Sequence, residues 1–185
     1  MSISAKDRAQ DNIALLNRKY DLIADAKSAL MDTNSSVIIL NICNNMNTFG
    51  AGFNKTIAQE FPIAKENYHL LGATKIKNAL GHTQFVTTKI NPKHKNEIII
   101  ANMICQTGIM STTNTRPINY CFLGICLAKT QSYIKQYLSQ KDLPIKVFSP
   151  KFQGNVTGAN WSFVYDLILD TLRKPTFTHV YESYN

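Results

Sequence analysis

The sequence lacks the long apolar segment that a membrane-spanning helix requires. No apolar run approaches the roughly 18–20 residues needed to cross a bilayer. The first residues are polar and charged (Lys6, Asp7, Arg8, Asp11), which disfavours a signal peptide. These features predict a cytoplasmic protein that does not bind a membrane.

Cysteine and histidine patterns that would hold a metal are also missing. The four cysteines form no Cys-x-x-Cys pair and have no histidine at zinc-finger spacing. The histidines are scattered and form no ligand or triad pattern (His69, His82, His94, His179). We therefore expect no metal site and no cofactor, and we expect the cysteines to be reduced core residues (Cys43, Cys105, Cys121, Cys126).

The composition is that of a globular domain with a positive charge. At 185 residues, 44% of them apolar and 17% charged, the chain is long enough for a three-layer core. The formal net charge of +8 favours polyanions and nucleotides. The lysines are dispersed, and the densest basic cluster, residues 93–95, falls in a short turn. We read this as a solvated surface with a mild attraction for anions, with nucleic-acid binding as an alternative.

One stretch combines a strand, a glycine loop and a helix start. Residues 37–40 form a short, β-branched apolar run typical of a strand covered on both faces. Residues 44–52 are rich in asparagine and glycine, and Asn54 can cap the helix that follows. Such a loop lets backbone amides approach an anion. Gly-Ala-Gly also occurs in ordinary tight turns.

The same pattern of strand, loop and helix start occurs again near the C-terminus. Residues 146–149 read as a strand, residues 149–160 as a loop, and Asn160 as the cap of a helix that begins at Trp161. Between the two stretches, residues 97–104 form a second apolar strand. Gln106 then emerges at its carboxyl end, where open α/β sheets place ligands. The alternative for Gln106 is a polar residue that caps a loop.

The remaining elements follow from periodicity. Apolar residues at alternating three- and four-residue steps predict one helix from residue 5 to about residue 31. Residues 83–89 have strand composition and lead through the turn at 91–96 into the next strand. Pro62 ends or restarts a helix, a long helix opens near Arg116, and residues 177–181 form a closing strand.

Three segments together resemble the macro domain family, whose members bind ADP-ribose. Residues 41–53 resemble its first ligand loop, residues 100–106 (Ala-Asn-Met-type) resemble its central strand, and residues 149–161 resemble its second phosphate loop. The resemblance covers about residues 37–181. It implies a three-layer α/β/α fold with a mixed central sheet and an added N-terminal helix, divided as an extension over 1–34 and a macro domain-like part over 35–185.

The resemblance also assigns roles to residues. Asn44 would contact the distal ribose and is the one catalytic candidate, the catalytic residues being otherwise unknown. Gln106 would lie at the end of the central strand. The diphosphate would lie between the first loop (Gly50, Ala51, Gly52, Phe53) and the second (Gly154, Asn155, Val156, Thr157, Gly158, Ala159).

Several family markers are absent. The lysine and aspartate of one hydrolase subgroup are replaced by Cys105 or Gln106 and by Thr157, and the histidine of the phosphatase-like subgroup is replaced by Asn41. A third subgroup, in which the substrate's own phosphate and a water do the work, is compatible with Asn44 and the glycine loop. The leading strand with its Gly-Asp pair, whose aspartate reads the adenine, is not found in the sequence.

Three functional hypotheses follow. In the first, the protein recognises ADP-ribose or an ADP-ribose conjugate, with hydrolysis of an ADP-ribosyl linkage or a terminal phosphate left open. In the second, the same cleft is a non-catalytic binder or sequestering module for an NAD-derived nucleotide. The third is a basic nucleic-acid-binding domain. The partners implied are ADP-ribose or a related nucleotide, and ADP-ribosylated protein or nucleic acid.

Overall fold

Two fully buried strands, β2 (Ser36–Asn44) and β4 (Glu97–Gln106), lie at the centre of the molecule. The computed structural model describes residues 13–17, 19–32, 35–141, 143–152, 157–173 and 176–182. There a six-stranded sheet has the order β1-β6-β5-β2-β4-β3. The other strands are β1 (Ile13–Leu16), β3 (Thr83–Ile90), β5 (Ile145–Pro150) and β6 (Phe177–Tyr181). Only the β3–β4 pair among these is antiparallel, so the predicted mixed sheet is confirmed.

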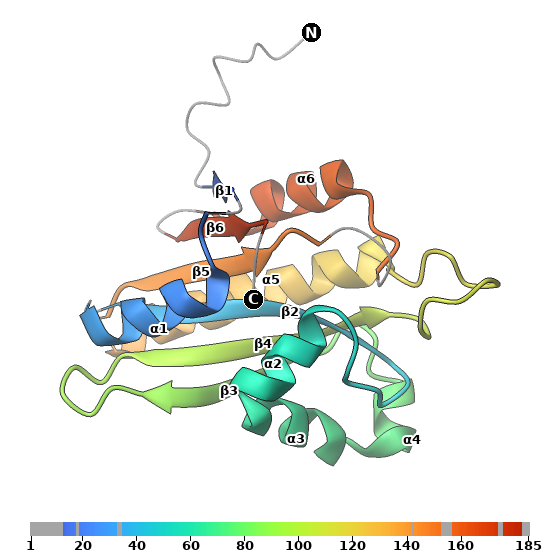
Figure 1. Ribbon diagram of the computed structural model, residues 1–185, viewed down its shortest axis with the longest axis horizontal. Helices are drawn as coiled ribbons and strands as arrows, with labels where there is room; N and C mark the ends of the chain where they lie inside the picture. The colour runs from blue at the N-terminus through green and yellow to red at the C-terminus, as the bar shows by residue number, and fades with distance from the viewer. Residues whose placement is uncertain are drawn as a thin grey trace, which may run out of the picture.

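Helices cover both faces of this sheet (Figure 1). On one face lie α1 (Leu22–Asp32), α2 (Phe53–Glu60), α3 (Pro62–Leu70) and α4 (Gly72–Lys77). The other face carries α5 (Tyr120–Lys141) and α6 (Trp161–Thr171). Successive residues of β2 enter the two cores alternately, Ile39 with α1 to α4 and Ile38 with α5 and α6, as the pleat of a strand requires. The three-layer α/β/α architecture is confirmed.

The parallel strands all end at the same edge of the sheet. Backbone hydrogen bonds continue the pairing past the strand ends: Asn45 N donates to Gln106 O (3.0 Å), Lys151 N to Tyr181 O (2.8 Å), and Glu182 N to Leu16 O (3.1 Å). The segments after β1, β6, β5, β2 and β4 therefore lie along one edge in that order. In open α/β sheets this edge is where ligands bind.

The prediction of one long helix over residues 5–31 is wrong for residues 13–16. These form β1, which pairs with β6 from Ile13 opposite Thr178 to Leu16 opposite Tyr181. The helix is confirmed only as α1, and residues 5–12 lie outside the described residues. A leading strand is thus present, contrary to the expectation from the sequence. Both β1 and α1 join the main sheet and core, and a domain boundary at residue 35 stays a prediction.

The cysteines divide into two environments. Cys43, Cys105 and Cys126 are buried and unbridged, as expected of reduced core residues, and burial raises the pKa of all three thiols. Cys121 is exposed on α5, so the core prediction is wrong for it. Within the described residues, no helix is both long and apolar enough to span a membrane.

Candidate functional site

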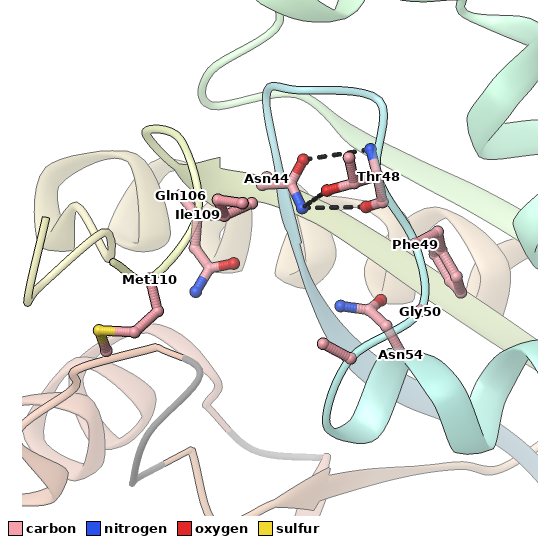
Figure 2. A pocket seen from close by; sticks show the side chains of 9 residues that line it. Asn44, Thr48, Phe49, Gly50, Asn54, Gln106, Ile109 and Met110 are labelled. Carbon is pink, nitrogen blue, oxygen red and sulfur yellow. Dashed lines mark hydrogen bonds between the residues drawn. The ribbon is translucent and has the colours of Figure 1, made fainter. Parts of the chain in front are cut away.

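A cavity of about 540 Å³ opens at the carboxyl edge, beside the ends of β2 and β4. Figure 2 shows the side chains around it, with Gln106 between Met110 on one side and Asn54 on the other. The first loop, the N-terminal turn of α2, the end of β4 and the segment after β4 supply its described lining (Asn44, Thr48, Phe49, Gly50, Ala51, Asn54, Gln106, Ile109, Met110). The structure thus brings together Asn44, Gly50, Ala51 and Gln106 from the predicted set.

Asn44 holds the first loop in shape. Its Nδ2 donates to the Thr48 carbonyl (2.9 Å) and to Thr48 Oγ1 (2.8 Å) (Figure 2). Its Oδ1 accepts from Met46 N (2.9 Å). The Tyr68 hydroxyl donates to Asn44 O at 2.7 Å. An asparagine amide offers two donors and one acceptor oxygen, and here both ends are engaged within the protein. Asn44 therefore lines the cavity while it shapes the turn.

A buried cluster of three asparagines fixes α2 to the sheet. Asn41 Nδ2 donates to Asn54 Oδ1 and to Asn102 Oδ1, both at 2.9 Å, and Asn54 Nδ2 donates to the Ile42 carbonyl (2.9 Å). Asn54 was expected to cap α2, but the N-cap is Gly52 and Asn54 lies inside the helix. The cap prediction is wrong because the Asn54 side chain turns inward to the strand.

Gly52 has a backbone that other residues rarely adopt. Its φ is 55° and its ψ is −137°, a region essentially restricted to glycine. As the N-cap it has no side chain to accept from the first amides of α2. Those amides carry the positive end of the helix dipole, which favours an anion.

A narrower pocket of about 50 Å³ joins the two predicted loops. Ala51, Gly52 and Phe53 line one side of it, and the segment after β5 lines the other (Pro150, Lys151, Phe152, Thr157). The loops meet because β2 and β5 are adjacent parallel strands. Ala51, Asn54 and Gln106 line both this pocket and the larger cavity, so the two spaces form one cleft.

Of the six residues of the second loop that were predicted to bind the ligand, Thr157, Gly158 and Ala159 are described. Gly154, Asn155 and Val156 lie outside the described residues. Thr157 O accepts from Ile118 N (3.2 Å). Gly158 has φ 62°, and a Cβ there would lie 2.4 Å from Thr115 O, so only glycine fits this close approach. Thr157 faces the narrow pocket, whereas Gly158 and Ala159 are absent from the described lining of both spaces.

The structure also identifies residues that the sequence did not assign. The larger cavity adds Thr48, Phe49, Ile109 and Met110, and the narrow pocket adds Lys151. Lys151 Nζ lies 3.5 Å from Glu182 Oε1 and 5.9 Å from the centre of the Trp161 ring. Its position directly after a strand that leads into a glycine loop was an available signal. The Arg116 guanidinium packs over the Tyr120 ring (5.9 Å).

Asp21 lies just after the strand β1, which the sequence did not predict. It follows this strand after a short turn, in the pair Tyr20-Asp21. Asp21 Oδ1 accepts from Ala24 N (2.8 Å) and so caps the start of α1. Asp21 is the first acidic residue after β1, and recognition of β1 in the sequence would have singled it out.

The described side chains that line the larger cavity can form hydrogen bonds, but none of them can take up or release a proton at neutral pH. Among the described residues that line it, none is titratable at neutral pH, because asparagine, glutamine and threonine side chains keep their protons. Asn41 is fully buried beneath the loop. A general base from these residues is therefore not available.

Comparison with known proteins identifies the fold. No family model and no curated protein matches the chain. A solved protein of unknown function from Bacteroides thetaiotaomicron is similar at 23% identity and a TM-score of 0.69, over 91% of this chain and 98% of that one. A macrodomain protein from Streptomyces coelicolor matches at 22% identity and a TM-score of 0.66, over 92% and 98%.

A third similar structure contains a ligand. Thermosipho africanus DarTG in complex with ADP-ribose matches at 13% identity and a TM-score of 0.62, over 93% of this chain and 41% of that one. At these identities the similarity establishes the fold alone. The chain has the macro domain fold, which confirms at the level of architecture the resemblance drawn from residues 37–181.

Proposed function

We propose that the protein recognises ADP-ribose or an ADP-ribose conjugate in the cleft at the carboxyl edge of the sheet. The observation that carries the proposal is the narrow pocket, which Gly52 and Phe53 line on one side and Lys151 and Thr157 on the other. The start of α2 and the Gly52 backbone line this pocket together with Lys151, and helix amides and a nearby lysine suit a diphosphate. The ADP-ribose complex of the similar Thermosipho DarTG supports the choice of ligand.

We propose that the bound ligand runs along the carboxyl edge in the order of the strands. With the diphosphate at the narrow pocket, the distal ribose enters the larger cavity near Asn44 and Gln106, beside β2 and β4. The adenosine then extends the other way, past β5 and β6 toward β1, where Asp21 is our candidate for adenine recognition. The net charge of +8 assists the approach of the dianionic ligand.

The lining favours recognition over catalysis by a protein base. The larger cavity has no titratable group among its described lining residues, and the Asn44 amide is engaged with Thr48. Hydrolysis directed by the substrate's own phosphate is the second candidate. Orientation alone can supply about 7–11 kcal/mol in well-aligned reactions, and the rigid loop around Asn44 favours such alignment.

Titration calorimetry with ADP-ribose tests recognition. The proposal expects one ligand per chain with micromolar affinity, clearly tighter than AMP, which lacks the diphosphate. No heat at millimolar ADP-ribose would overturn it. Incubation with ADP-ribosylated protein, ADP-ribosylated DNA and ADP-ribose 1″-phosphate separates turnover from binding. Strong binding to unmodified oligonucleotides that falls steeply with salt would favour the nucleic-acid alternative.

A further inference from the structure

The outer wall of the larger cavity is apolar. Ile109 and Met110, from the segment between β4 and α5, form one side, and Phe49 contributes from the first loop (Figure 2). Ile109 remains 53% exposed, although burial would be favourable for such a side chain. Among the described lining residues none carries a charge at neutral pH.

The segment that presents Ile109 is held in place by its own hydrogen bonds. Asn114 Nδ2 donates to the carbonyls of Thr107 (2.9 Å) and Ile109 (3.1 Å). Asn45 Oδ1 accepts from Gly108 N at 2.8 Å, which ties the segment to the first loop. These hydrogen bonds therefore fix the turn that holds the exposed Ile109 at the cavity.

The cavity is larger than one sugar requires. Its volume of about 540 Å³ lies within the range of roughly 300–1,000 Å³ that whole small-molecule ligands occupy. The hydroxyls of a ribose match the polar part of the lining, at the Thr48 hydroxyl and Gln106. A ribose would leave the apolar wall formed by Ile109 and Met110 without a ligand group packed against it.

We propose that this outer space takes an uncharged group with a large apolar surface, linked to C1″ of ADP-ribose. This rests on the proposed function and names the chemistry of the conjugate. A terminal phosphate fits poorly, because an anion placed against Ile109 and Met110 would lose hydration without a cation to replace it. The site thus selects an aromatic or similarly apolar conjugate.

Calorimetry with three ligands tests the proposal: ADP-ribose, ADP-ribose 1″-phosphate and ADP-ribose with a 1″-benzyl group. The benzyl compound is expected to bind at least about tenfold more tightly than ADP-ribose, and the phosphate more weakly. In the double variant Ile109→Ser with Met110→Ser, the ratio of the benzyl affinity to the ADP-ribose affinity is expected to fall to about one, whatever the affinity for ADP-ribose itself. Ile125→Ser on α5, also an exposed isoleucine (41%), should keep the advantage.

The outcomes distinguish failure of this proposal from failure of the proposed function on which it rests. If ADP-ribose itself does not bind, the proposed function and this inference both fail. If ADP-ribose binds but the benzyl group adds nothing, or the phosphate binds best, only the inference is overturned. Two further probes identify the source of the conjugate: ADP-ribose linked to a tyrosine phenol and ADP-ribose linked to the base of a pyrimidine nucleoside. A larger gain in affinity over ADP-ribose with the first indicates a protein conjugate, and a larger gain with the second indicates a nucleic-acid conjugate. No gain with either probe counts against the proposal.

Discussion

Asn41 Nδ2 on β2 donates a buried hydrogen bond of 2.9 Å to Asn54 Oδ1 on α2. With the bond from Asn54 Nδ2 to the Ile42 carbonyl, it fixes the start of α2 against the end of the central strand. The geometry of the first loop depends on this attachment, because the loop enters α2 at Gly52. A change at Asn54 therefore affects both stability and the site.

Replacement of Asn54 by alanine is expected to lower the free energy of unfolding by about 1–3 kcal/mol, because the Ile42 carbonyl loses its donor and Asn41 loses one acceptor. Urea unfolding measures this, and calorimetry should show weaker ADP-ribose binding. Asn67→Ala is the control, since the Asn67 side chain donates to the Ile63 carbonyl of its own helix and the bond from Gln84 Nε2 to the Asn67 backbone carbonyl is kept. Equal effects of the two variants would contradict the anchoring role.

Gly158→Ala is expected to destabilise the protein by about 1–3 kcal/mol, the usual cost of a strained backbone. The added Cβ would lie 2.4 Å from Thr115 O, at a residue with φ 62°. The matched control is Gly50→Ala, where a Cβ meets nothing within 4 Å. Thermal unfolding measures both, and an unchanged midpoint for Gly158→Ala would refute the close packing of the second loop.

The first loop could be predicted from the sequence as a structural unit because its signals are local. A β-branched run, two glycines and a helix start within residues 37–61 define a strand–loop–helix unit without knowledge of the rest of the fold. The ends of β4 and β5 were predicted by the same local logic. Neighbouring parallel strands then bring Gln106 and Thr157 to one edge.

What the sequence did not show depends on distant partners. β1 has four residues, and its apolar spacing suits a helix as well, so its strand state is decided by pairing with β6 at the other end of the chain. Asn54 looks like a cap until Asn41 is placed beside it. Ile109 and Met110 carry no motif, and only the fold brings them to the cavity.

Native alkylation with iodoacetamide should modify one thiol per chain, at Cys121. Burial raises the pKa of Cys43, Cys105 and Cys126, and the thiolate is the reactive form. Mass spectrometry at pH 7.5 measures the number, and all four cysteines of the sequence should react in denaturant. Rapid native modification of Cys43 would place it outside the core beneath the first loop.

The free energy of unfolding should fall as pH drops below about 6.5, the ordinary histidine value. Burial, followed by the charge of Lys146, lowers the pKa of His179, against a smaller opposing effect of Asp25. The folded state then binds fewer protons than the unfolded state, so stability rises with pH through this window. His179→Phe keeps the packing against Phe148 and Phe177 (5.2 Å each) and should flatten the dependence. An unchanged slope in urea titrations would exclude His179 as its source.

The charge at residue 51 tests most directly whether a diphosphate lies between the two loops. Ala51 is exposed and lines both the larger cavity and the narrow pocket, so either glutamate or glutamine can be placed there without backbone strain. A carboxylate about 4 Å from a phosphate costs roughly 4 kcal/mol at an effective dielectric constant of 20. By calorimetry, Ala51→Glu should bind ADP-ribose at least about 100-fold more weakly than Ala51→Gln, which has the same size and no charge. Equal affinities in the two variants would show that the diphosphate lies elsewhere and would contradict the proposed site.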